Sequence, residues 1–366
     1  MEEKLTTLAS LPYSKAEILS SILKSEGIDC FLENVDFLQN GMDTGVSVRI
    51  YEKNARQAFP ILEKMLGKVI HDPVKRENYV LVPVDFSSYS LKAALVGFDI
   101  AEKLGSKMVL YHSYPQPEFL TIPYSDVIVY DSALFLNYEM AEKETHKKFE
   151  EFLSKLTSLI DNTRWKKAKP EYILKVGEAE DDILSYINIH PPKLVVMGIR
   201  GGDEQSDELL GTTTASVIFN AKVPVLAIPE MTPDNWLENF RRVAYATIFE
   251  SNDFIAIDRL LKLLTPFDTK VFCVHVDQGN NPNLDEAMLE GMKEALDEKY
   301  PHSTFECHLI HHKNLPEAID HFIEDNHIDV LALTTHRRNL LTRLFNPSIS
   351  KKMVLHTQTP LLIFHA

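Results

Sequence analysis

The chain has 366 residues, enough for two or three domains, and hydrophobic residues make up 45% of it, enough for a substantial core. Its net charge of −15 excludes a broadly basic surface, so we expect neither general nucleic-acid binding nor docking on an anionic membrane. No apolar run approaches the roughly 20 residues of a membrane span, and the acidic first residues do not have the pattern of a secretion signal, so we expect a cytoplasmic protein.

Residues 1–70 predict a small domain with the order β-α-β-β-α. Residues 67–77, with a proline and mixed charges, predict a linker after it. The segment SLPYSKAEILSSILKSEGIDCFLEN resembles a small bacterial signal-transducing domain, a resemblance that implies no chemistry. The expected strands are 4–9, 28–33 and 46–51, and the expected helices are 14–26 and 54–66.

Residues 77–230 alternate short apolar runs with helical periodicity, a pattern typical of a parallel sheet covered on both faces. In such doubly wound sheets, ligands bind at the carboxyl ends of the strands, at the switch point. Asp85 and Gly198 both follow expected strands, so we expect them at this edge. The expected strands are 80–84, 107–112, 171–175, 194–197 and 223–228, and the expected helices are 90–103, 137–160, 179–189 and 213–220.

A glycine motif follows the fourth of these strands: Gly198, Gly201, Gly211 and Thr212 have the spacing G-x2-G-x9-G-T. Because a helix is expected next, its first N–H groups can face an anion, and Thr213 adds a hydroxyl. Glycine is suited to close approach of the backbone to a phosphate. The motif predicts a phosphate site; the alternative is a set of tight turns in a doubly wound fold that binds nothing.

The motif and its flanks resemble the ATP-binding type of the universal stress protein family, which has an adenine nucleotide alpha hydrolase-like fold. The resemblance extends, in order and over about 150 residues, to YVLVPVDFSSYSLKAALVGFDIA with Asp85, to MVLYHSYP with His112, and to KVPVLAIP. It implies that the residue matching Asp85 contacts adenine, together with the backbone near Val84. Ser113 stands where the family commonly has an apolar residue beside adenine. The expected nucleotide-binding residues are Pro83, Val84, Asp85, Ser113, Met197, Gly198, Arg200, Gly201, Gly211, Thr212 and Thr213.

Several of these residues have a second interpretation. Asp85 precedes Ser87 and could instead stabilise a turn or a helix start. Arg200 could donate to a phosphate or lie solvated at the surface. Four carboxylates within the motif repel a triphosphate unless a divalent cation intervenes. The loop therefore either faces water or makes nucleotide binding weak or Mg²⁺-dependent; its carboxylates are Asp203, Glu204, Asp207 and Glu208.

Residues 240–366 predict a second copy of the same domain. Gly198 and Thr334 are separated by 136 positions, whereas LVPVDF (81–86) aligns with VAYATI (243–248) at 162 positions. The difference predicts 26 extra residues in the first copy, after His112. The second copy has lost the motif, so we expect it to be degenerate and not to bind ATP. The replacements are Thr334 for Gly198, Arg337 for Gly201, Pro347 for Gly211 and Thr247 for Asp85.

Other polar residues give weaker indications. The three cysteines Cys30, Cys273 and Cys307 form no C-x-x-C pair, which favours a reducing compartment without a disulfide framework. The histidines of the second copy lack partners at metal-ligand spacing, so we expect no metal site; they are His308, His311 and His312. A basic cluster in the second copy could bind another anion or a partner, or be solvated; it comprises His336, Arg337, Arg338, Arg343, Lys351 and Lys352.

The sequence leaves three hypotheses of function. The first is a stress or signalling protein that binds ATP in its first copy and is recognised by an unidentified protein partner. The second is a weak ATPase or an adenylate-kinase-like enzyme, although no P-loop, G-x-S-x-G or H-E-x-x-H motif occurs and no catalytic residue is assigned. The third is a scaffold without nucleotide. Family members commonly pair through their last strands, so strands 223–228 and 360–364 predict an internal pseudo-dimer, with a homodimer also open.

Overall fold

The computed structural model describes residues 5–34, 45–54, 57–58, 61–62, 77–114, 132–200, 210–247, 251–278, 282–300, 304–334 and 359–364. The chain divides into two compact units. The first unit contains residues 75–239 and 357–363, and the second contains residues 1–74, 240–356 and 364–366. In the described part of the chain, no helix is long and apolar enough to cross a membrane.

The first unit is built on a parallel sheet with the strand order β8-β7-β4-β5-β6. Its strands are β4 (Glu77–Pro83), β5 (Lys107–Tyr114), β6 (Glu171–Val176), β7 (Pro192–Gly198) and β8 (Val225–Ile228). All five were expected from the sequence, with bounds that differ by a few residues. The chain runs outward from β4 to β6 and then returns to β7 on the other side of β4. This return creates a switch point beside β4, where ligands of doubly wound sheets bind.

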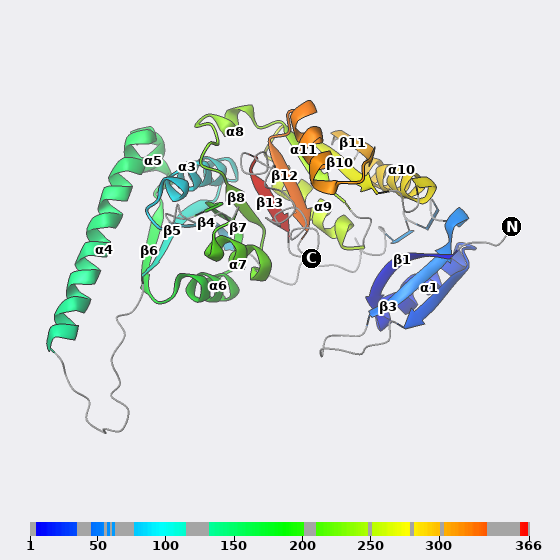
Figure 1. Cartoon of the computed structure of the whole chain (residues 1–366), viewed down its shortest axis with the longest axis horizontal. Helices are drawn as coiled ribbons and strands as arrows, with labels where there is room; N and C mark the ends of the chain where they lie inside the picture. Colours follow the sequence, from blue (N-terminus) through cyan, green and yellow to red (C-terminus); the bar gives the residue numbers. More distant parts are fainter. Residues whose placement is uncertain are drawn as a thin grey trace, which may run out of the picture. The chain divides into compact units, whose positions relative to one another are not determined.

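Helices cover both faces of this sheet (Figure 1). The helix α3 (Ser88–Lys103) packs on β4, β5 and β7, and α4 (Ser132–Leu159) packs on α3. On the opposite face, α6 (Ala179–Ile189) packs on β5 and on α7 (Thr212–Asn220). Two shorter helices, α5 (Asn162–Ala168) and α8 (Trp236–Asn239), complete the unit. The resulting α/β layers are those of a doubly wound fold, as the sequence predicts.

The last strand of the chain also belongs to the first unit. Strand β13 (Leu361–Phe364) pairs antiparallel with β8, with Leu361 opposite Ala227 and Ile363 opposite Val225. All four residues of each strand are buried. The sequence of the second copy therefore supplies a strand at the edge where the first copy's parallel sheet ends.

The second unit contains a parallel sheet with the order β11-β10-β9-β12. Its strands are β9 (Arg242–Ala246), β10 (Lys270–Asp277), β11 (Thr304–His311) and β12 (Val330–Thr334). Its helices are α9 (Ser251–Leu264), α10 (Pro282–Lys299) and α11 (Leu315–Asp325). Phe272 and His308 contact Phe322 of α11 on one face, whereas Lys293 and Asp297 of α10 lie near Cys307 on the other. The tandem α/β architecture predicted from the sequence is therefore present.

Residues 1–74 include a three-stranded antiparallel sheet with the order β1-β3-β2. The strands are β1 (Leu5–Pro12), β2 (Cys30–Asn34) and β3 (Gly45–Tyr51), with α1 (Tyr13–Ser25) between the first two and a 3₁₀ turn, η1 (Glu52–Asn54), after the third. Leu19, Leu23, Val48 and Ile50 are fully buried between the helix and the sheet. The expected helix at 54–66 is described only at residue 54, which ends the 3₁₀ turn, and at residues 57–58 and 61–62, which are helical.

Hydrogen-bond registers correct the sequence alignment of the two copies by one residue. Val84 N–H donates to Tyr111 O at 2.8 Å, and Thr247 N–H donates to Val274 O at 2.9 Å. The ring Nδ1 atoms of His112 and His275 contact the carbonyl oxygens of the same two residues, Val84 and Thr247. Thr247 therefore stands where Val84 stands, at an offset of 163 positions.

The prediction that Thr247 replaces Asp85 is consequently wrong. Strand pairing gives the same offset of 163. Val80 pairs with Leu194 between β4 and β7, and Val243 pairs with Val330 between β9 and β12, so Val243 stands where Val80 stands. With the offset of 136 for the later strands, the first copy has 27 extra residues rather than 26. The error arose because short apolar strands align almost equally well in neighbouring registers.

Candidate functional site

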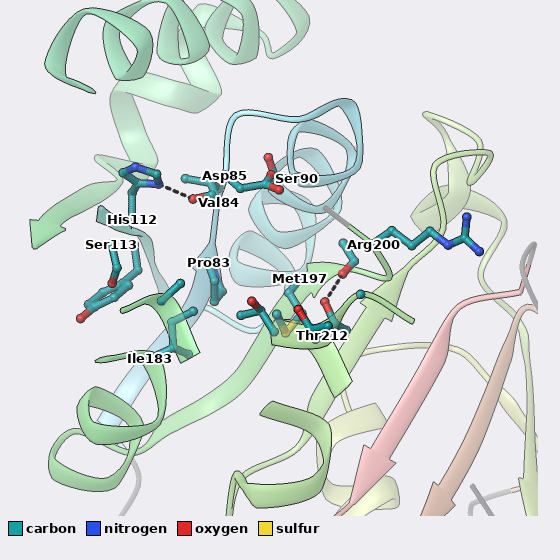
Figure 2. Close-up of a pocket in the computed structure, with 16 residues that line it drawn as sticks. Pro83, Val84, Asp85, Ser90, His112, Ser113, Ile183, Met197, Arg200 and Thr212 are labelled. Atoms are coloured by element: carbon teal, nitrogen blue, oxygen red, sulfur yellow. Dashed lines mark hydrogen bonds between the residues drawn. The ribbon is translucent and has the colours of Figure 1, made fainter. Parts of the chain in front are cut away.

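A cavity of about 300 Å³ opens at the carboxyl edge of the first unit's sheet. The ends of β4, β5 and β7 and the first turns of α6 and α7 form its walls (Figure 2). It lies at the switch point beside β4, which is where the sequence predicts a ligand site. The residues that line it are Pro83, Val84, Asp85, Ser90, Tyr111, His112, Ser113, Ala179, Ile183, Met197, Gly198, Arg200, Gly211, Thr212, Thr213 and Thr214.

Ten of the eleven predicted nucleotide-binding residues line this one cavity. The eleventh, Gly201, lies outside the described residues, as do the four carboxylates at 203, 204, 207 and 208. The cavity also contains residues that the prediction omitted, including Ser90, Tyr111, Ala179 and Ile183. Their only sequence signal is their position near a strand's carboxyl end or a helix's first turn.

The end of β4 is held by its own hydrogen bonds. Val84 donates its N–H to Tyr111 O, and its carbonyl oxygen lies 2.7 Å from His112 Nδ1. Because a carbonyl can only accept, His112 must carry its proton on Nδ1 when the ring is neutral. The main-chain N–H of Val84 is thus already used, while its carbonyl oxygen keeps one lone pair for a ligand.

Asp85 has a structural role in the next turn. Its Oδ1 accepts hydrogen bonds from Ser87 N at 3.1 Å and from Ser87 Oγ at 2.6 Å. Ser87 is in turn the N-cap of α3, where its Oγ accepts from Ser90 N at 3.2 Å. Asp85 therefore fixes the start of α3, which is the second interpretation of the sequence. Its carboxylate is also exposed at the cavity, so this role does not exclude ligand contact.

His112 lies in a cluster of aromatic side chains. Its ring packs against Phe86 with centroids 4.1 Å apart and ring planes tilted by 34°, and Phe86 also contacts Phe149 and Phe152 of α4. Burial lowers the pKa of His112, although the bond to the Val84 carbonyl and the charge of Asp85 act in the opposite direction. A neutral ring leaves Nε2 as an acceptor. Phe86 itself has a φ of 68°, a left-handed conformation that is rare for a bulky residue.

The two ends of the glycine motif are joined by short hydrogen bonds. Gly211 N–H donates to Ile199 O at 3.0 Å, and Thr214 Oγ1 donates to Gly198 O at 2.8 Å. These bonds bring the start of α7 directly beside the end of β7. The first-turn amides of a helix have no partner inside the helix. Gly211 is the N-cap and has no side chain to bond them, so the amides of Thr212 and Thr213 are placed at the cavity to receive an anion.

Gly198 is required by packing inside the protein. A Cβ at this position would lie 2.8 Å from Tyr89 Cβ and 2.9 Å from Arg200 O. The absence of a side chain at Gly198 therefore allows its main chain to lie close to α3 and to the loop that follows β7. Arg200 lines the cavity with part of its chain, but Figure 2 shows its side chain extending away from the other lining residues. In this conformation the guanidinium does not reach the place where Thr212 and Met197 lie.

Helix α6, which packs beside α7, forms a further wall of the cavity. Ile183 is buried and reaches the cavity, and Ala179 lines it at the first residue of the helix. Just before the helix, Gly177 has a φ of 153°, and a Cβ there would lie 2.1 Å from Asp182 Oδ2. Asp182 also pairs with Lys175 at 2.7 Å. These contacts fix the turn between β6 and α6 and hence the apolar side of the cavity.

Taken together, the cavity has two chemically different ends. Ile183 and the ring of Tyr111 give an apolar region suited to a flat ring, and burial raises the pKa of Tyr111 so that its hydroxyl stays protonated. The α7 N-terminus with Thr212 and Thr213 gives a polar region suited to a negative group. Such an anion is typically stabilised by about 0.3–1 kcal/mol by the helix dipole.

A family model described as the universal stress protein family matches residues 78–229 and 239–365, which together make up most of the chain. The chain belongs to the universal stress protein family. A comparison with curated proteins gave no match.

Solved structures of the family are similar to this universal stress protein, and the first of those below shares its fold. A universal stress protein from Archaeoglobus fulgidus is 17% identical, with a TM-score of 0.55, and the match covers 79% of this chain and 97% of that one. The universal stress protein UspA from Lactobacillus plantarum is 21% identical, with a TM-score of 0.30, over 42% of this chain and 97% of that one. A universal stress protein in complex with cAMP is 23% identical, with a TM-score of 0.29, over 41% and 96%.

In the second copy of this universal stress protein, polar side chains near the equivalent strand ends interact with one another. Buried Asp253 of α9 accepts hydrogen bonds from Tyr245 Oη and Thr247 Oγ1, each at 2.7 Å. Burial and the Asp253 charge raise the pKa of Tyr245 well above its usual value. Thr334, the residue in place of Gly198, lies near the same tyrosine and acts on its pKa in the opposite direction. Arg337 and Pro347, which replace the other two glycines, lie outside the described residues.

The histidines of the second copy have local partners. His308 packs on Phe272 and Phe322, His311 Nδ1 lies 3.1 Å from Asp277 Oδ2, and His312 Nδ1 lies 2.7 Å from Asn314 O. Within the ranges that the structure describes, no three His, Cys, Asp or Glu side chains are grouped to hold a metal ion. The basic cluster at 336–352 is outside these ranges.

Proposed function

We propose that the first copy binds an adenine nucleotide, ATP with or without Mg²⁺, in the cavity between β4, β7 and α7, and that the protein acts in stress signalling through this binding. The observation that carries the proposal is the arrangement of an apolar region and a helix N-terminus around one cavity at the switch point. A volume of about 300 Å³ is at the lower end of the range for small-molecule sites.

Each part of the nucleotide has a candidate environment. We assign the base to the side of the cavity near Val84, Ile183 and Met197, where the Val84 carbonyl can accept from an exocyclic amino group. We assign the phosphates to the amides and hydroxyls of Thr212 and Thr213, at the start of α7. These contacts bind and orient a nucleotide, but they supply no group that activates water or a second substrate. The proposed function is therefore nucleotide-dependent signalling rather than catalysis.

The internal pseudo-dimer stays part of the proposal. The antiparallel pairing of β13 with β8 supports it, because the two strands come from different copies of the sequence. A protein partner of unidentified type would distinguish the occupied from the empty form. Such a partner responds to nucleotide only if its affinity differs between the two forms.

A cavity-filling variant tests the binding site without changing its charges. Ala179 is half-buried and lines the cavity, so Ala179→Trp places a large ring in it. Ala215→Trp is the matched control, since Ala215 is half-buried on α7 but is not among the lining residues. Calorimetric titration of the full chain with ATP, ADP, AMP and cAMP, with and without Mg²⁺, should show binding to the wild type and to the control but not to Ala179→Trp.

The same titration separates the other hypotheses. Equal binding by Ala179→Trp and wild type would place the nucleotide elsewhere and refute the assignment. No binding of any nucleotide, in protein whose fold is intact by circular dichroism, would favour a scaffold. Steady-state phosphate release that is lost in Ala179→Trp but kept in Ala215→Trp would identify a weak ATPase. Equal affinities with and without Mg²⁺ would remove the predicted role of the metal.

A further inference from the structure

Two cysteines of the second unit lie directly opposite each other on neighbouring strands. Cys273 belongs to β10 and Cys307 to β11, and the parallel register pairs them. Both are free thiols; Cys273 is buried and Cys307 is half-buried. The two thiols are close enough for each to shift the pKa of the other. Because β11 is the first strand in the order of this sheet, Cys307 lies at its edge.

The surroundings make the two thiols chemically different. The interaction with Cys273 lowers the pKa of Cys307, and the charge of Lys293 on α10 acts in the same direction, against burial and Asp297. The interaction with Cys307, together with burial, raises the pKa of Cys273 well above its usual value. Thiolates are the nucleophiles in oxidation, and accessibility selects among them. Cys307 is therefore the thiol that reacts first with an oxidant, and Cys273 is the thiol that then attacks the oxidised Cys307.

The strand geometry permits a bond between them. Neighbouring strands lie about 4.7–4.9 Å apart, within the range of about 4.4–6.8 Å between the Cα atoms of a disulfide. Parallel paired side chains point the same way, so their Cβ atoms start farther apart than the mean of about 3.8 Å in disulfides. Closing the bond pulls them together, and a strained disulfide is more easily reduced. This geometry favours a reversible bond over a permanent one.

We propose that Cys273 and Cys307 form an oxidant-responsive site, which a peroxide converts to an intramolecular disulfide and a dithiol reductant restores. The Cys307 thiolate attacks a peroxide oxygen; the S–O bond forms, the O–O bond breaks, and the leaving hydroxide takes a proton to become water. The Cys273 sulfur then attacks Cys307 sulfur; the S–S bond forms, the S–O bond breaks, and the leaving hydroxide takes the Cys273 proton as a second water. Two thiols lose two electrons and two protons, and hydrogen peroxide is reduced to two waters.

The disulfide would tie the edge strand β11 to β10 beneath α10. This helix packs on both strands, with Met292 and Leu296 buried against them (Figure 1). Oxidation would therefore change the second unit and not the cavity of the first unit. The site does not depend on the proposed nucleotide function, and either can fail without the other.

Peptide mapping of the full chain tests the bond directly. After stoichiometric hydrogen peroxide at neutral pH, we expect two thiols per chain to disappear together and a linked peptide pair joining Cys273 to Cys307. Dithiothreitol should restore both thiols. Cys30→Ser should behave as the wild type, because Cys30 is buried in the small sheet and its thiol bonds Ser20. Cys307→Ser should prevent the loss of the Cys273 thiol.

Lys293 provides a second test that does not remove a cysteine. Lys293→Gln should oxidise several-fold more slowly at neutral pH, and at the wild-type rate above the ordinary thiol pKa, where Cys307 is a thiolate in both proteins. Lys299→Gln, farther along the same helix, should oxidise at the wild-type rate throughout. Cys307 found as sulfinic acid beside a reduced Cys273 would overturn the proposal. So would disulfides between chains, or equal neutral-pH rates for Lys293→Gln and wild type.

Discussion

The first glycine of the motif gives the sharpest test of the packing. In Gly198→Ala, the new Cβ would lie 2.8 Å from Tyr89 Cβ, 2.9 Å from Arg200 O and 3.0 Å from Tyr89 C. These atoms belong to the main chain or are bonded directly to it, so a change of rotamer cannot move them away. Overpacking of this kind typically costs 1–3 kcal/mol. We expect the free energy of unfolding of the first unit to fall by about 2 kcal/mol, with no nucleotide present.

The chain provides a convenient probe for this unit. Its two tryptophans, Trp165 and Trp236, both lie in the first unit, where Trp165 stacks on Phe98 and Trp236 is buried. Urea unfolding followed by tryptophan fluorescence therefore reports on the unit that contains the cavity. A midpoint that moves with an unchanged slope would give the stability difference directly.

Gly211→Ala is the matched control within the same motif. Gly211 has φ −63° and ψ 149°, an extended conformation open to any residue, so the variant should lose less than about 1 kcal/mol, as expected for a weaker N-cap. If Gly198→Ala unfolds at the wild-type urea midpoint but no longer binds nucleotide, the packing argument is refuted. The glycine would then be needed for the ligand.

Three further predictions concern single interactions. Thr214→Val removes a buried 2.8 Å bond to the β7 carbonyl and should lower the free energy of unfolding by about 1 kcal/mol by the same fluorescence assay. Asp253→Asn leaves Tyr245 or Thr247 without an acceptor and should cost about 1–3 kcal/mol in thermal unfolding followed by circular dichroism. Burial lowers the pKa of His112 in the folded protein below its value in the unfolded chain. The neutral ring therefore stabilises the fold above the unfolded-state pKa, and this stabilisation is lost as the pH falls below that pKa. His112→Gln should accordingly flatten the pH dependence of urea unfolding.

Each of these has a contradicting outcome. Thr214→Val with a wild-type midpoint would mean that the β7 carbonyl has another donor. Asp253→Asn with unchanged melting would show that the buried triad of hydroxyls and carboxylate contributes nothing. The His112 prediction is contradicted if the free energy of unfolding of the wild type, relative to that of His112→Gln, rises between neutral pH and pH 5.5. The pKa of folded His112 would then be raised rather than lowered. Thr157→Val, which removes the local bonds of a half-buried hydroxyl to the Leu153 and Ser154 carbonyls within α4, is the control for Thr214→Val.

Local signals explain why the fold could be predicted. The strands β4, β7 and β8 are runs of buried apolar residues. Helix α3, which follows β4, and helix α6, which precedes β7, have clear helical periodicity, so a few neighbouring residues are enough to indicate each element. The glycine motif likewise indicated that the ligand site lies at the carboxyl edge of the sheet. Ten of the predicted site residues then met at one cavity because the carboxyl ends of parallel strands converge.

Other features depend on contacts that no local pattern records. Ile183 and Ser90 face the cavity only because α6 and α3 pack on opposite faces of the sheet. The one-residue error at Thr247 could be resolved only by hydrogen bonds between strands. The pairing of Cys273 with Cys307 joins residues far apart in the sequence through a parallel register, so their wide spacing gave no sign of it.

The measurement that tests the central claim most directly is the nucleotide stoichiometry of the full chain. Native mass spectrometry with excess Mg²⁺–ATP should give one nucleotide per chain for the wild type and for Ala215→Trp, and none for Ala179→Trp. Two nucleotides per chain would show that the second copy binds as well, despite its Tyr245–Asp253 network. One nucleotide retained in Ala179→Trp would contradict the account, because the first copy's cavity would then not be the site.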